Sequence, residues 1–158
     1  MKIQINNNQQ IRKPDSRKLK ELLTFLAQKT GILEGYSGYD EFSVLFTDDS
    51  GIRQVNQQLL DRAETTDVIC HGYDPIPGEK NRTAEIVVNV EKAVLEASRN
   101  IKIEESWEIA LYLAHACNHL SGRDDKTPAQ RKSMRRRESS WLREAGSRKL
   151  LAGLIRKN

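Results

Sequence analysis

Two histidines one helical turn apart, followed by a glycine and two acidic residues, form the stretch of this chain best suited to chemistry. The stretch runs from His115 to Asp125 and reads H-x3-H-x2-G-x2-D. Residues four apart on a helix lie on one face, so His115 and His119 can bind one metal ion together. Gly122 can adopt the left-handed conformation that ends a helix, and the returning chain can bring Asp125 to the same ion. Three protein ligands leave a tetrahedral position open for water, as in catalytic zinc sites.

Neighbouring residues offer alternatives to this ligand set. Asp124 competes with Asp125, but Asp125 is six residues after His119, the spacing of the third ligand in the metzincin motif, and we favour it. Cys117 falls on the opposite side of the predicted helix among apolar residues, so we expect a core residue there. Ala116 occupies the position at which zincin proteases carry their general-base Glu, which argues against a peptidase.

The charge of the chain is divided unevenly along its length. Residues 126–158 contain 11 Lys and Arg against 2 Asp and Glu, a net charge of +9, whereas residues 1–125 have a net charge of −5. Two i, i+4 pairs of cations stand on a predicted helix of this block: Arg131 with Arg135, and Lys132 with Arg136. A basic surface beside a metal site suits RNA, because phosphate contacts release condensed counterions. Trp141 is the block's one aromatic residue, so sequence-specific readout by stacking is not expected.

Length and composition indicate a soluble globular protein. The chain has 158 residues, of which 37% are hydrophobic and 30% charged. We expect one domain over residues 1–150 and a frayed basic tail over 151–158. No apolar run approaches the roughly 18 residues of a membrane span, and the first residues contain no signal-peptide segment. The two cysteines, Cys70 and Cys117, form no disulfide framework and suit a reducing cytoplasm.

Apolar periodicity predicts four strands and five helices. The strands are expected at residues 2–6, 42–46, 67–70 and 84–88, and a loop at 72–82. The helices are expected after caps at 15–16 and 48–50, and at 90–99, 107–120 and 128–145. This alternation predicts an α+β fold, a three-layer α/β/α domain with a mixed, roughly four-stranded sheet. The helix over 107–120 is apolar on almost all sides, so we expect it to be buried and to carry the metal histidines in a zincin-like arrangement.

Three motifs in this order have a counterpart in a known family. Asn56 is followed by Thr66-Asp67-Val68-Ile69-Cys70-His71, by Ala84-Glu85-Ile86-Val87-Val88, and then by the His-rich helix. The chain resembles the YbeY endoribonuclease family of bacterial rRNA maturation factors over roughly residues 1–145. That family's patterns are T-[DN]-V-L-S-F, G-D-I-x-I and the metal motif H-G-x-L-H-L-x-G-x-D-H. The metal motif here reads H-A-C-N-H-L-S-G-R-D-D, in which Asp125 replaces the third histidine.

The resemblance implies a fold, a cofactor and an activity. It implies a zinc-binding α/β/α domain with one Zn²⁺ ion, which cleaves single-stranded RNA during 16S rRNA maturation and ribosome quality control. The RNA partner would be rRNA of the small ribosomal subunit. Leu60 stands where the family usually has an Arg that contacts phosphate, so this contact is either lost or made by Arg62 or Arg53. His71 and Glu85 are the candidates for moving a proton at the site.

Two other functions are compatible with these residues. Differences from the family motif at Leu60, Ala116 and Asn118 would suit a catalytically impaired metal-binding factor that binds RNA during ribosome assembly. The metal ligands alone would also suit a metal-dependent hydrolase of another substrate. A peptide substrate is disfavoured, because Ala116 stands in place of the general-base Glu. Comparing RNA cleavage with RNA binding separates these functions from a nuclease.

Overall fold

This computed structural model describes residues 2–32 and 38–158 of the chain, which contain five helices and six strands joined by loops. The strands are β1 (Lys2–Asn7), β2 (Lys13–Pro14), β3 (Glu41–Thr47), β4 (Val68–Tyr73), β5 (Thr83–Asn89) and β6 (Ile155–Arg156). The helices are α1 (Ser16–Lys29), α2 (Asp49–Leu60), α3 (Val90–Arg99), α4 (Glu105–Leu120) and α5 (Pro128–Ser147). The four longer strands and all five helices confirm the elements predicted from periodicity.

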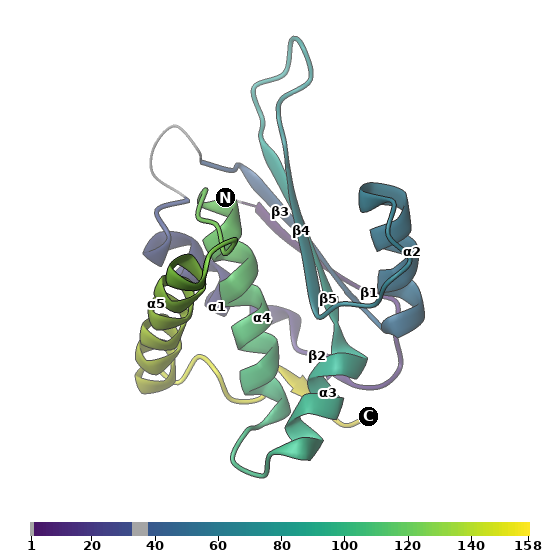
Figure 1. The fold of residues 1–158 in the computed structure, drawn as a ribbon, viewed down its shortest axis with the longest axis vertical. Helices are drawn as coiled ribbons and strands as arrows, with labels where there is room; N and C mark the ends of the chain where they lie inside the picture. The colour runs from purple at the N-terminus through teal and green to yellow at the C-terminus, as the bar shows by residue number, and fades with distance from the viewer. Residues whose placement is uncertain (1, 33–37) are drawn as a thin grey trace.

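The main sheet is mixed and has the strand order β1-β3-β5-β4. β1, β3 and β5 are parallel, and β4 pairs with β5 in the antiparallel sense. β4 therefore forms one free edge of the sheet. The predicted loop at 72–82 is wrong at its start, because β4 continues to Tyr73. The connection between β4 and β5 projects beyond the sheet (Figure 1).

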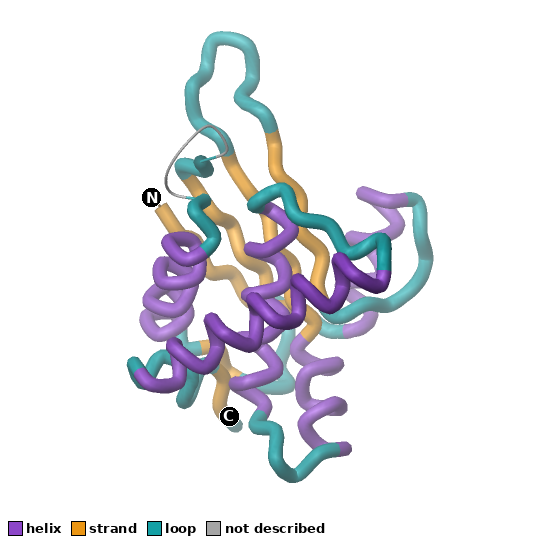
Figure 2. Tube along the Cα trace, turned by 60° about the vertical axis from the view of Figure 1, so that its left-hand side comes forward, coloured by secondary structure: helices purple, strands orange, loops and turns teal. Residues whose placement is uncertain are grey.

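The helices cover both faces of this sheet. α1, α4 and α5 lie on one face and α2 lies on the other, as Figures 1 and 2 show, which confirms the three-layer architecture. Eleven of the sixteen residues of α4 are buried, so α4 is the central helix that the sequence predicted. None of the described helices is both long and apolar enough to cross a membrane.

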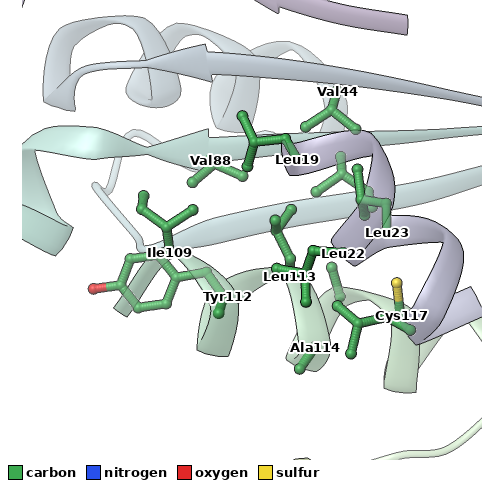
Figure 3. Close-up of a cluster of buried hydrophobic side chains, with 14 of the residues drawn as sticks. Leu19, Leu22, Leu23, Val44, Val88, Ile109, Tyr112, Leu113, Ala114 and Cys117 are labelled. Atoms are coloured by element: carbon green, nitrogen blue, oxygen red, sulfur yellow. The ribbon is translucent and has the colours of Figure 1, made fainter. Parts of the chain in front are cut away.

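Side chains that alternate along the strands fill two separate cores. On β5, Ile86 and Val88 belong to the main core beneath α1 and α4, whereas Val87 joins a small core with Ile52 of α2 and Ile69 of β4. Successive strand residues point to opposite faces, so one apolar strand serves both layers. Figure 3 shows part of the main core, with α1 and α4 contributing the following labelled residues: Leu19, Leu22, Leu23, Ile109, Tyr112, Leu113, Ala114 and Cys117.

The last residues of the chain are packed, so the expected frayed tail at 151–158 is wrong. β6 pairs antiparallel with β2, and the Asp15 amide donates to the Leu154 carbonyl at 2.8 Å. Leu154 is fully buried and Ile155 is 5% exposed, both in the main core. Burial of these two apolar side chains holds the segment against the domain despite its basic neighbours.

Candidate metal centre and adjoining cavity

The end of α4 turns the chain back on itself. The Ser121 amide donates to the Cys117 carbonyl, and the next residue, Gly122, has a φ of 94°. This left-handed conformation favours glycine and ends the helix. α5 then starts at a capping box formed by Thr127 and Gln130. The short connection between the two helices places Asp125 beside the histidines of α4.

His115, His119 and Asp125 are brought together with a spacing that suits one metal ion. Their nearest ligand atoms all lie within 4.8 Å of one another. The two Nε2 atoms are 3.1 Å apart, and Asp125 Oδ2 lies 3.7 Å from His115 Nε2 and 3.5 Å from His119 Nε2. Ligands about 2.0–2.2 Å from a tetrahedral zinc ion are separated by roughly 3.3–3.6 Å. Two of the three separations lie slightly outside this range, so small movements of the side chains would bring the three ligand atoms around a zinc-sized ion.

A buried carboxylate behind His115 orients this group. Glu138 of α5 is 2% exposed, and its Oε2 lies 3.0 Å from His115 Nδ1 and accepts a hydrogen bond from Asn118 Nδ2 at 2.9 Å. Because a carboxylate accepts, we assign the proton of the neutral imidazole to Nδ1, which leaves the Nε2 lone pair to face His119. The same hydrogen bond raises the pKa of His115.

The two facing Nε2 atoms need a proton or a metal ion between them, because either an N–H of one ring or an ion bound to both lone pairs would join them. Two imidazole lone pairs 3.1 Å apart repel each other unless a proton or a metal ion is shared. A second carboxylate, Asp125, supplies the negative charge that such a cation attracts. The donor set and its hydrogen-bonded support could therefore hold a metal ion.

The competing residues near the centre make other contacts. Asp124 accepts a hydrogen bond from the Asp125 amide at 2.9 Å and pairs with Lys126 at 3.3 Å, and it does not belong to the group of converging ligand atoms. Cys117 is fully buried in the main core, as predicted, and burial raises the pKa of its thiol. Ala116 is also fully buried.

A cavity of about 840 Å³ runs along the free edge of β4 and reaches the metal group. His119 and Asp125 line it from one side, and Arg62 and His71 line it with the strand. Its size is within the usual range of ligand sites. His71 and Arg62, which the sequence singled out, therefore share one cavity with two of the three metal-group residues.

Glu85 is not brought into this cavity. It lies opposite His71 in the β4–β5 register, accepts a hydrogen bond from the Tyr73 hydroxyl at 3.0 Å, and lines a different hollow on the α2 face. Its contact with the site is indirect, through the His71 and Tyr73 rings, whose centroids are 4.5 Å apart.

The end of α2 contributes an apolar wall to the cavity. Leu60, the last residue of α2, lines the cavity and is 52% exposed. Arg62 also lines it, whereas Arg53 is not among the lining residues. Of the two arginines proposed for the phosphate contact, the structure thus brings only Arg62 to the cavity.

The basic side of α5 adjoins the metal group from the opposite direction. Arg131 and Arg135 line a small hollow with His115, Asp125 and Glu138. Arg131 Nη1 donates to the Asp125 carbonyl at 3.2 Å. Lys132 and Arg136 are exposed on the adjacent ridge of the helix. We call these four cations the α5 basic ridge.

Glu138 was the functional residue that the sequence did not reveal. It hydrogen-bonds to a histidine 23 residues earlier, a contact that no local pattern records. One sign was present: Glu138 falls on the buried stripe of α5 with Met134, Trp141 and Leu142. An acid on the apolar face of a basic helix indicates a buried partner.

The fold and site together define a class: a mixed-sheet α/β/α domain with a two-histidine, one-aspartate group at the end of its central helix. A family described as Endoribonuclease YbeY matches residues 2–146. The chain belongs to this YbeY family. Curated members named Endoribonuclease YbeY include one from Rhodopirellula baltica, 31% identical over 131 residues, and one from Pelotomaculum thermopropionicum, 32% identical over 133 residues.

Coverage differs among these relatives. The Rhodopirellula match covers 81% of this chain and 66% of the relative, and the Pelotomaculum match covers 78% and 84%. The chain spans only 54–66% of the length of the relatives from Rhodopirellula and two Anaeromyxobacter strains. A Moorella thermoacetica relative is 27% identical over 152 residues, covering 90% of this chain and 97% of its own length.

One solved structure has the same fold. The solution structure of TM1509 from Thermotoga maritima superposes with a TM-score of 0.60 and 20% sequence identity, over 93% of this chain and 91% of that protein. At this level of identity the likeness supports the fold alone.

Proposed function

We propose that this protein is a metal-dependent endoribonuclease that cleaves single-stranded RNA at the His115, His119 and Asp125 centre. The observation that carries the proposal is the convergence of these three ligand atoms in front of a buried carboxylate, next to a cavity and a basic ridge. Membership of the Endoribonuclease YbeY family supports the choice of RNA as the substrate. Zinc is the proposed ion, one per chain, because two imidazoles and a carboxylate form a common catalytic zinc set.

Each residue of the site has a proposed role that depends on its position. His115, His119 and Asp125 would hold the metal ion, which would supply a Lewis acid for attack on a phosphodiester. Glu138 holds His115 in the tautomer that presents Nε2. Arg62 and the α5 basic ridge bind phosphates on either side of the centre. His71 is the proposed group for proton transfer, since it lines the same cavity.

The biological setting follows from the family. We propose rRNA of the small ribosomal subunit as substrate, with roles in 16S rRNA maturation and ribosome quality control. A cytoplasmic location suits this substrate. The free cysteines agree with a reducing compartment.

The test compares cleavage with binding in one variant. His115→Ala removes a ligand, so we expect cleavage of a labelled single-stranded RNA to fall at least about 100-fold while binding of that RNA is largely kept. Metal analysis of both purified proteins should find close to one zinc per wild-type chain and little in the variant. A wild-type protein that binds RNA but does not cleave it, with or without added zinc, would contradict the nuclease. It would support instead an RNA-binding assembly factor, the function that the substitutions at Ala116, Asn118 and Leu60 suggest.

A further inference from the structure

The pairing of β4 with β5 determines which backbone groups face the cavity. The Asn89 amide donates to the carbonyl of Asp67, the residue directly opposite it in the β4–β5 register. Opposed residues in an antiparallel pair alternate between hydrogen-bonded and non-hydrogen-bonded positions. Ile69, His71 and Tyr73 therefore bond to β5, and the N–H and C=O groups of the residues between them point away from the sheet.

Two of these outward residues have unused hydrogen-bonding groups. The outward amide of Val68 donates to the side chain of Asp67 at 2.7 Å, which agrees with this alternation. For Cys70 and Gly72, no hydrogen bond to the outward N–H is found among the described residues. Both residues line the 840 Å³ cavity that also contains His119 and Asp125. The edge of β4 thus presents two amide donors and two carbonyl acceptors to the cavity that the metal group also lines, with a repeat of about 6.8 Å.

Apolar side chains flank this edge from both faces of the sheet. Leu60 at the end of α2 and Leu120 at the end of α4 line the cavity, and α2 and α4 cover opposite faces of the sheet. A flat ring that hydrogen-bonds to the strand edge would lie between these two leucines. Each nucleobase has adjacent donors and acceptors on its Watson–Crick edge and apolar faces above and below, so an unpaired base meets both requirements.

We propose that the free edge of β4 at Cys70 and Gly72 pairs with the Watson–Crick edges of unpaired bases and thereby selects single-stranded over double-stranded RNA. This inference rests on the proposed function for its substrate. A base in a duplex has its Watson–Crick edge occupied by its partner, so it cannot bond to the strand. The backbone N–H and C=O groups can form hydrogen bonds with any of the four bases once the base slides along the strand to match donors with acceptors. The edge therefore selects unpaired bases and does not select a sequence.

The position of the edge agrees with the other parts of the site. His119 and Asp125 line the same cavity, so the sugar and phosphate of a base bound at the strand edge lie toward the metal group. Arg131 and Arg135 approach that group from its other side. Bases would face β4, and phosphates would face the metal group and α5.

Amide hydrogen exchange tests the proposal directly, in metal-chelated protein so that the RNA stays intact. A saturating single-stranded oligonucleotide should slow exchange at Cys70 and Gly72 by about tenfold or more. Ile69, His71 and Tyr73 are the internal controls, because their amides already bond to β5. The same oligonucleotide annealed to its complement, or lacking its bases, should leave Cys70 and Gly72 unchanged.

Several results would overturn the inference. Equal protection by the abasic oligonucleotide would mean that the edge of β4 binds phosphates and not bases. Equal protection by the duplex would mean that this edge does not distinguish single-stranded from double-stranded RNA. Protection by an extended peptide but by no oligonucleotide would make it a polypeptide-binding edge. Cleavage of RNA by the metal-loaded protein, with no change at Cys70 and Gly72, would refute this inference and leave the proposed function standing.

A pair of leucine variants gives a second readout. Leu60→Ser removes the apolar contact with the base and should weaken binding of the normal oligonucleotide about fivefold or more, without weakening binding of the abasic one. Leu59→Ser is the matched control, since Leu59 is also exposed on α2 but lines the hollow on the other side. Equal effects of the two substitutions would contradict a base at this position.

Discussion

Glu138 shows how much of the site depends on a single residue outside the motif. The local spacing of His115, His119 and Asp125 was enough to predict their convergence, because a helix face and a glycine turn determine it. The orientation of His115 was not predictable, because it depends on how α5 packs against α4. That packing brings together residues 23 apart in sequence.

Removal of this carboxylate should weaken metal binding. We expect Glu138→Ala to lower zinc affinity by about 10–100-fold, since His115 loses the acceptor that fixes its tautomer. Glu138→Gln should lose less, because its amide oxygen can still accept from His115 and Asn118. Competition against a chromophoric chelator measures both. Glu144→Gln is the control on the same helix, where Glu144 pairs with Lys29 at 2.6 Å away from the site. A wild-type affinity in Glu138→Ala would refute the orienting role.

The Cys70 thiol should react slowly in the folded protein. Burial raises its pKa to about 11, so very little thiolate is present at pH 8. Because the folded pKa exceeds the unfolded value of about 8.5, this thiol favours folding less as pH rises from about 8.5 toward 11. Alkylation at pH 8, followed by mass spectrometry, should be much slower in native than in urea-unfolded protein. Equal rates in the two states would contradict this burial.

At the scale of elements, apolar periodicity predicted the long helices and strands and missed the short strands β2 and β6. The helices and the main strands each contain enough residues to show an apolar repeat. β2 and β6 have two residues each and pair across almost the whole chain, Lys13 with Arg156, so neither shows a pattern. β4 was predicted to end at Cys70, because its last residues lie on the exposed edge and alternate without a strong apolar repeat.

The α5 basic ridge should bind phosphates without regard to sequence. Reversing Arg135 and Arg136 to Glu should weaken RNA binding about equally for all sequences and reduce the log–log salt slope by about 0.7 for each lost contact. Metal content should stay unchanged. Fluorescence anisotropy across a salt series measures the slope.

A charge-matched double reversal provides the control for the ridge. Lys20→Glu with Lys102→Glu makes the same change in net charge, but Lys20 lies on α1 and Lys102 precedes α4, at the end far from the metal group (Figure 1). The control should keep most of the slope. A wild-type slope in the Arg135 and Arg136 variant would mean that the ridge is only a solvated surface.

At the scale of the whole molecule, the site lies where three distant segments meet. The end of α4 with the loop after it, the end of α2 with the loop after it, and the free edge of β4 enclose the cavity. The C-terminal segment packs against the core on the opposite side. The sequence predicted the three layers but not the packing of the C-terminal segment, because two buried apolar residues there are surrounded by basic ones. Leu154 and Ile155 make the last segment part of the domain.

Truncating one of these side chains should destabilise the fold. Leu154→Ala should lower the free energy of unfolding by about 2–5 kcal/mol, as for other fully buried leucines. Ile101→Ala is the control, since Ile101 is fully exposed and its loss should cost little. Urea denaturation compares the two. Equal stabilities of the two variants would show that the tail does not contribute to the core.

The proposed nuclease activity requires a metal ion held by His115, His119 and Asp125. The most direct measurement is the cleavage rate of an end-labelled single-stranded RNA by wild-type protein before chelation, after chelation and after return of zinc, with His119→Ala in parallel. Metal-dependent cleavage predicts that chelation abolishes the wild-type activity, that zinc restores it, and that His119→Ala is at least about 100-fold slower than the wild type both before chelation and after return of zinc. Cleavage at the wild-type rate by the chelated protein, or by zinc-supplied His119→Ala, would contradict it.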